Sequence, residues 1–78
     1  MTERELQLIL ENFTISYEIL LAASTERCDL TSVATARQGA ALDLGYRIRL
    51  RAGCIPSALV AELHGIKGVE SVDLRREL

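Results

Sequence analysis

Ten consecutive residues alternate between apolar and polar side chains, and no other segment constrains the fold of this chain so strongly. Asp, Gly or Arg follows each apolar residue of the run, and the apolar positions are Leu42, Leu44, Tyr46, Ile48 and Leu50. Successive side chains of a β-strand point to opposite faces of its sheet, so a period of two is typical of a half-buried strand. We therefore predict a strand over residues 42–51, with its apolar face inward and its charged face in water.

A second strand is expected just before this one, over residues 29–37, where Thr and Val are frequent. Leu30 and Val33 fall on opposite parities of that strand, and a β-bulge would bring them to one face. Residues 38–41 then supply a turn, in which Gly39 can adopt a positive φ. Together these segments predict a β-hairpin.

The C-terminal third has the pattern of a helix followed by a strand. Pro56 suits the first turn of a helix, where its missing N–H has no intrahelical partner. Apolar side chains recur every fourth residue through residues 55–63, which places one apolar stripe on a helix over residues 57–64. Gly65 suits the C-terminal cap of that helix, and alternation returns over residues 69–75 as a final strand.

The N-terminal third permits two interpretations. In the first, residues 5–11 form a strand with three leucines inward, and residues 14–27 form a helix. In the second, a capping box from Thr2 to Glu5 begins a helix, and the alternation from Phe13 to Ile19 is a strand. The apolar stripe of that helix would be Leu6, Ile9, Leu10 and Phe13. The first gives two βαβ halves of similar length, and the second adds a strand that packs less naturally with two helices. We favour the first interpretation.

These elements predict a single α+β domain over residues 1–78, a ferredoxin-like βαββαβ sandwich. Its four-stranded antiparallel sheet would carry two helices on one face. Seventy-eight residues suffice for one domain and no more. With one Phe, two Tyr and no Trp, its core must be largely aliphatic.

Composition argues against nucleic acid and membrane-spanning segments. Acidic residues outnumber basic ones by eleven to nine, whereas nucleic-acid binding depends on Lys and Arg. No apolar run approaches the ~20 residues of a bilayer-spanning helix. Cys28 and Cys54 form no disulfide framework and no CxxC motif, so we expect a cytoplasmic protein with two free thiols.

Two segments carry a family resemblance, DLTSVATARQGAALDLGYRIRLR and LVAELHGIKGVESVDL. They resemble the ACT-like C-terminal domains of MgtC/SapB-type and related membrane-attached proteins. The shared features are the glycine-centred hairpin, the strand with Tyr46-Arg47-Ile48, and the Gly68-Val69-x-x-Val72 entry to the last strand. The resemblance implies a cytoplasmic regulatory or assembly domain that follows a transmembrane region and has no chemistry of its own.

The chain departs from ligand-binding ACT domains at the turn after the first predicted strand. Those domains carry a Gly there, at the place where an amino acid docks. Residues 11–14 contain no Gly, so amino-acid binding of that type is not expected. The same turn has no Arg, which an acylphosphatase-like activity would need to hold phosphate.

Arg47, Arg49 and Arg51 share one parity and would form a basic stripe on the sheet. Such a stripe suits phosphate, acidic lipid or RNA. It also suits pairing with the outward residues of the first strand, namely Glu5, Gln7 and Glu11. RNA-binding sheets of this fold carry aromatic side chains for base stacking, and this face has none. We therefore expect the stripe to serve charge pairing.

Cys28, Cys54 and His64 are the soft metal ligands of the chain. The two cysteines would be cross-strand neighbours if the hairpin centred on Ala41, and would be separated by a shift of one residue. A zinc site needs a third and a fourth ligand, so we expect no metal and no cofactor. We expect no catalytic residues either, because His64 belongs to the end of a helix and no nucleophile has a recognisable turn.

These observations favour a non-enzymatic regulatory or oligomerisation module, in a parent protein that holds it at the membrane. The alternative is a sensor that binds a small molecule at a dimer interface. In a βαββαβ sheet the strand order is 4-1-3-2, so residues 29–37 lie at an edge. Seven uncharged residues, 30–36, follow one another there. Because exposed edges are normally blunted by charge or proline, we predict a homodimer formed through this strand.

Overall fold

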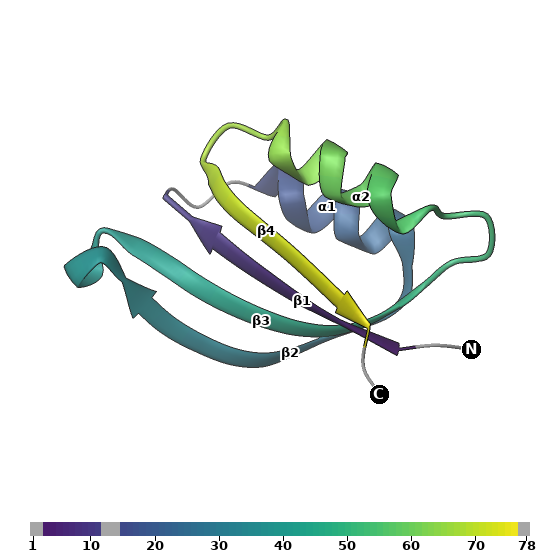
Figure 1. Ribbon diagram of the computed structural model, residues 1–78, viewed down its shortest axis with the longest axis horizontal. Helices are drawn as coiled ribbons and strands as arrows, with labels where there is room; N and C mark the ends of the chain where they lie inside the picture. Colours follow the sequence, from purple (N-terminus) through teal and green to yellow (C-terminus); the bar gives the residue numbers. More distant parts are fainter. Residues whose placement is uncertain (1–2, 12–14, 77–78) are drawn as a thin grey trace.

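The computed structural model describes residues 3–11 and 15–76, and Figure 1 shows their arrangement. The chain order is β1 (Glu3–Leu10), α1 (Ile15–Ser24), β2 (Thr25–Ala36), a 3-10 turn η1 (Arg37–Gly39), β3 (Ala41–Leu50), α2 (Pro56–His64) and β4 (Val69–Arg76). The strands form one antiparallel sheet in the order β2-β3-β1-β4, and both helices lie on one of its faces. The predicted ferredoxin-like fold is confirmed. We call the face that carries the helices the helix-side face and the other the open face.

The N-terminal segment is a strand, so the first interpretation of it is confirmed and the helical one is wrong. The inward leucines, Leu6, Leu8 and Leu10, are at most 1% exposed. Ile9, which the helical interpretation placed on its apolar stripe, instead lies opposite Asp43 on the open face. Thr2 and Phe13, which also belonged to that interpretation, lie outside the described residues. The central position of β1, between β3 and β4, gives all three leucines neighbours on both sides.

The first helix is shorter than predicted, because residues 25–27 belong to β2. The end of α1 is held by side chain and backbone together. Thr25 Oγ1 donates a hydrogen bond to the Leu21 carbonyl at 2.7 Å, and Arg51 N donates to the Ser24 carbonyl at 3.0 Å. These donors satisfy carbonyls that the last turn of a helix leaves without a partner. The helix can therefore end at Ser24, and β2 begins at the next residue. The predicted first residue of the helix, Thr14, is outside the described residues.

The bulge expected in the second strand is present. The register of β2 against β3 shifts between Leu30 and Ser32, so that Leu30 lies opposite Tyr46 and Val33 opposite Leu44. Both therefore belong to the helix-side face. Leu30 is nevertheless 53% exposed and Val33 60% exposed, because the helices do not reach over this edge strand.

The hairpin turn begins one residue earlier than predicted. Arg37 and Gln38 have φ values of 51° and 56°, and Gly39 follows at 90°. A positive φ is uncommon outside glycine, so the first two positions are strained. The Arg37 side chain forms an ion pair with Glu70 of β4, which ties this turn to the opposite edge of the sheet.

The core lies between the helix-side face and the two helices. Its buried apolar residues are Leu6, Leu8, Leu10, Tyr17, Leu21, Ala41, Leu44, Ile48, Leu59 and Leu63. As predicted, it is largely aliphatic. Tyr17 is the exception at 2% exposed, and Ile55, expected on the stripe of α2, is 61% exposed at the N-cap instead.

Candidate functional site

Charges of opposite sign alternate across the open face of the sheet. Asp29, Arg47, Glu5 and Arg75 lie side by side on β2, β3, β1 and β4, in that order. Opposite charges that face each other across a ladder stabilise a sheet by about 0.2–1 kcal/mol per pair. The row needs no ligand to balance it, since each charge has a counter-charge on the next strand.

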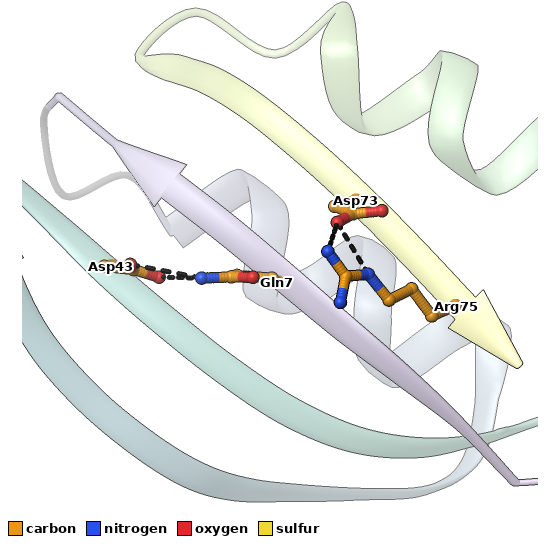
Figure 2. Close-up of polar contacts among 4 residues, drawn as sticks. All are labelled: Gln7, Asp43, Asp73 and Arg75. Carbon is orange, nitrogen blue, oxygen red and sulfur yellow. Dashed lines mark hydrogen bonds and ion pairs between the residues drawn. The ribbon is translucent and has the colours of Figure 1, made fainter. Parts of the chain in front are cut away.

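Hydrogen bonds extend this pattern along the face. Gln7 Nε2 donates to both carboxylate oxygens of Asp43, at 2.9 and 3.1 Å, and Arg75 pairs with Asp73 at 2.9 Å (Figure 2). Arg27 pairs with Asp29 at 2.9 Å on the edge strand. The polar groups of the open face are thus largely bonded to one another.

The predicted three-arginine stripe is only partly present. Arg47 and Arg49 lie on the open face, and Arg49 Nη2 is 3.8 Å from Glu3 Oε2. Arg51 follows the end of β3 and donates from Nη2 to the Ala22 carbonyl at 3.4 Å. That part of the prediction was wrong, because a strand's alternation ends where its pairing ends. Arg49 pairs with Glu3 of the first strand, and Arg47 lies opposite Glu5 in the register of that strand.

The expected partners on the first strand take different places. Glu5 lies opposite both Arg47 and Arg75, and Gln7 bonds to Asp43. Glu11 lies beyond the end of β1, where its N–H donates to the Gly68 carbonyl at 2.7 Å. Glu3, which the sequence analysis did not single out, is the residue beside Arg49.

A shallow polar depression of about 160 Å³ lies on the open face around Gly45. A Cβ at this position would collide with Ser32 Oγ, so the hydroxyl occupies the place of a side chain. Thr31 Oγ1 donates to the Gly45 carbonyl at 3.1 Å, and this hydrogen bond links the bulge of β2 to β3. Residues of four strands line the depression, and its charged groups are the carboxylates of Glu5 and Asp73 and the guanidinium of Arg75. Because Arg75 already pairs with Asp73 at 2.9 Å, the lining offers no basic group that is free to hold an anion.

The cysteines and the histidine do not converge. Cys28 lies in β2 opposite Ile48, and Cys54 lies in the loop before α2, so the two are not cross-strand neighbours. His64 is the exposed last residue of α2. Within residues 3–11 and 15–76, no three His, Cys, Asp or Glu side chains are grouped to hold a metal ion.

Two titratable groups near the β2 edge are held in their neutral forms. Partial burial of the sulfur, and then the charge of Asp29, raises the pKa of the Cys28 thiol, although the residue as a whole is exposed. Burial, followed by a hydrogen bond with Tyr17, raises the pKa of the Tyr46 hydroxyl well above its ordinary value. A thiol with a raised pKa is a weak nucleophile, because only the thiolate reacts.

Cys28 belongs to an apolar strip on the helix-side face of β2, and Tyr46 borders that strip from β3. We define the β2 strip as Cys28, Leu30, Val33 and Thr35, which lie opposite Ile48, Tyr46, Leu44 and Leu42. All four strip residues are exposed. The strip lies on an edge strand, and no described strand pairs with its outer side.

A second apolar surface lies where the end of α1 meets the start of α2. Ile55 is exposed there above an open groove of about 410 Å³, with Ala23 and Ala58 in its walls. The charged residues Arg51 and Glu62 also line this groove. The groove is wide and open, and it brings together no set of polar groups that would orient a small ligand.

No protein-family model matches the chain, and no curated protein matches its sequence. None of the described helices is long and apolar enough to cross a membrane. The fold and the surfaces above are therefore the observations from which a function can be argued.

Proposed function

We propose that this domain is a non-enzymatic regulatory or oligomerisation module that acts as a homodimer. The observation that carries the proposal is the pair of large apolar side chains on the edge strand, Leu30 at 53% and Val33 at 60% exposed. An edge strand also presents unpaired N–H and C=O groups to any chain that can align with it. A second copy covers both kinds of group at once, and a closed two-fold dimer is the commonest assembly.

The chemistry of the open face supports a role without catalysis. A catalytic site needs groups that are free to bind substrate and have pKa values suited to proton transfer. Here carboxylates of the face accept hydrogen bonds from neighbouring side chains, Asp43 from the Gln7 amide and Asp73 from the Arg75 guanidinium (Figure 2). Cys28 and Tyr46 have raised pKa values, which leaves them protonated at neutral pH.

The family resemblance extends this proposal to a cytoplasmic domain of a larger membrane protein. Two glycines of the resemblance have backbone conformations that favour glycine, since Gly39 has a φ of 90° and Gly68 a φ of 97°. They shape the hairpin turn and the entry to β4. The parent gene is then expected to encode several apolar segments of ~20 residues before this domain. A gene without them would refute the membrane attachment.

The mass of the domain in solution tests the homodimer. Sedimentation equilibrium at high micromolar concentration is expected to give twice the 8.6 kDa mass of the chain. A monomer at that concentration would refute the homodimer and the oligomerisation role with it.

The second candidate is a sensor that binds a small molecule at the dimer interface. It is favoured by the Tyr46 hydroxyl, a half-buried polar group opposite Leu30 and beside the β2 strip. A thermal-shift screen with amino acids and nucleotides tests this role. A ligand at 100 times its dissociation constant stabilises the protein by about 2.7 kcal/mol, and its effect should disappear in Tyr46→Phe if the hydroxyl binds it.

A further inference from the structure

We infer that two copies pair through antiparallel β2 strands, with the two-fold axis at Ser32, so that Leu30 of each copy lies opposite the partner's Val33. This inference rests on the proposed homodimer and specifies its surface. The two sheets would join into one of eight strands, and both helical layers would lie on the same side. The β2 strips of the two copies would then form one continuous apolar surface, which lies between the helices of one copy and those of the other.

The bulge in β2 makes this arrangement possible. Thr31 is the extra residue, so Leu30, Ser32 and Val33 lie opposite three successive residues of β3. Leu30 and Val33 are thereby neighbours on the helix-side face, and Ser32 lies between them on the open face. Without the extra residue, the two apolar side chains would point to opposite faces, because side chains alternate along a strand.

The choice of axis follows from which side chains it sets opposite each other. An axis at Leu30 would leave Val33 opposite the partner's Cys28, and an axis at Val33 would leave Leu30 opposite the partner's Thr35. An axis at Asp29 would face that carboxylate with its own copy, and like charges directly opposite are destabilising. Of these axes, only the one at Ser32 sets all four large apolar side chains against one another.

Charges at the ends of the strand agree with the same axis. Asp29 would lie opposite the partner's Ala34, so no like charges would meet in the middle of the pair. Glu26, which is exposed at a second register shift of β2, would lie near the partner's Arg37. The Arg37 side chain pairs with Glu70 of its own sheet and is still 67% exposed. The two-fold axis repeats this contact at the other end, and Arg27 beside it is paired with Asp29 of its own strand, so each end brings an acidic side chain near a basic one.

The bulge does not itself block the outer edge. Bulges can blunt an edge by twisting it away from a partner. Here Thr31 turns its hydroxyl to the Gly45 carbonyl of its own sheet, at 3.1 Å. The extra residue is thus bonded toward β3 and away from the proposed partner.

Disulfide cross-linking tests the register. Single cysteines are placed in a Cys28→Ser, Cys54→Ser background. Each variant is oxidised at the high micromolar protein concentration at which the dimer is expected. Ser32→Cys should cross-link with its own copy, because opposite Cα atoms of antiparallel strands lie about 4.5–5.5 Å apart, within the range of a disulfide. Leu30→Cys and Val33→Cys should cross-link when mixed, at least tenfold faster than either does alone. Ala58→Cys, exposed on α2, is the matched control and should form no disulfide-linked dimer under oxidation.

The outcomes separate the register from the proposed function. A dimeric mass with no cross-link at Ser32 or in the mixture would overturn the inference and leave the homodimer standing. Efficient self-cross-linking of Leu30→Cys would move the axis and also overturn it. A monomeric mass for the unmodified domain would refute the homodimer itself. Circular dichroism of each variant confirms that it is folded, and the mixed pair supports the register even if Ser32→Cys disturbs the bulge.

Discussion

Arg49 lies between a like charge and an opposite one on the open face. Arg27 lies opposite it on β2, and Glu3 lies opposite it on β1, with 3.8 Å between the Arg49 and Glu3 side chains. About a third of each side chain of this ion pair is exposed, at 35% and 31%. Exposed ion pairs contribute about 0–1 kcal/mol, so Arg49→Ala should lower the free energy of unfolding by less than about 1 kcal/mol. Urea denaturation measures this, and a larger loss would show that Arg49 has a stronger partner.

The same variant tests nucleic-acid binding. We expect the unmodified domain to show no measurable affinity for single-stranded RNA at moderate salt, because the arginines of the open face have carboxylate neighbours. Micromolar binding that weakens as salt rises, and is lost in Arg49→Ala, would show that this face binds RNA instead.

Tyr46 makes stability depend on pH in the alkaline range. Its pKa in the folded protein is raised above the ordinary value of 10.0, chiefly by burial, so the unfolded chain releases the proton first. The free energy of unfolding should therefore be unaffected by this group below about pH 9 and should fall as pH rises above 10. Urea denaturation at pH 8 and pH 11 measures the fall, which should be smaller in Tyr46→Phe. An equal fall in both proteins would assign the dependence to other groups.

At the scale of single elements, the N-terminal strand offers a sharp comparison between adjacent residues. Leu8 is fully buried on the helix-side face, whereas Ile9 lies on the open face. Leu8→Ala should destabilise the domain by about 2–5 kcal/mol, as truncation of a buried leucine does. Ile9→Ala should cost about 1 kcal/mol. A helical segment would reverse this order, because its apolar stripe would contain Ile9 and omit Leu8.

At the scale of the whole molecule, assembly should respond to charge on the edge strand. Val33→Lys would place a charge against the partner's Leu30 twice in each dimer, and we expect the dimer dissociation constant to rise at least tenfold. Because Val33 is 60% exposed in the monomer, the variant should remain folded. Sedimentation equilibrium measures the dissociation constant, and Thr35→Lys should weaken the dimer in the same way.

The matched control for this experiment is Ala58→Lys on α2. Ala58 is exposed and borders the groove near Ile55, far along the chain from the β2 strip. It should leave the dimer unchanged. Dissociation by Ala58→Lys, with no effect of either β2 variant, would place the interface on the helices.

Periodicity in the sequence by itself determined which face of most elements is apolar. The alternation from Leu42 to Leu50 predicted β3 and its inward side chains, and the parity conflict of Leu30 and Val33 predicted the bulge. The fold class followed, because two βαβ halves have few ways to cover one sheet face. The N-terminal segment fits both the alternation of a strand and the apolar stripe of a helix, so its local sequence left both structures possible. Pairing with both neighbouring strands decided it.

Only the tertiary structure decided what covers each apolar face. The sequence pattern of the β2 strip resembles that of a buried strand face, yet two helices on a four-stranded sheet leave the β2 strip exposed. Likewise Arg51 continues the arginine pattern but contacts the end of α1, and Tyr17 enters a core that composition predicted to be aliphatic. The physical reason is the same in each case. Periodicity records the direction of a side chain relative to its own backbone, whereas burial depends on the neighbours that packing brings to it.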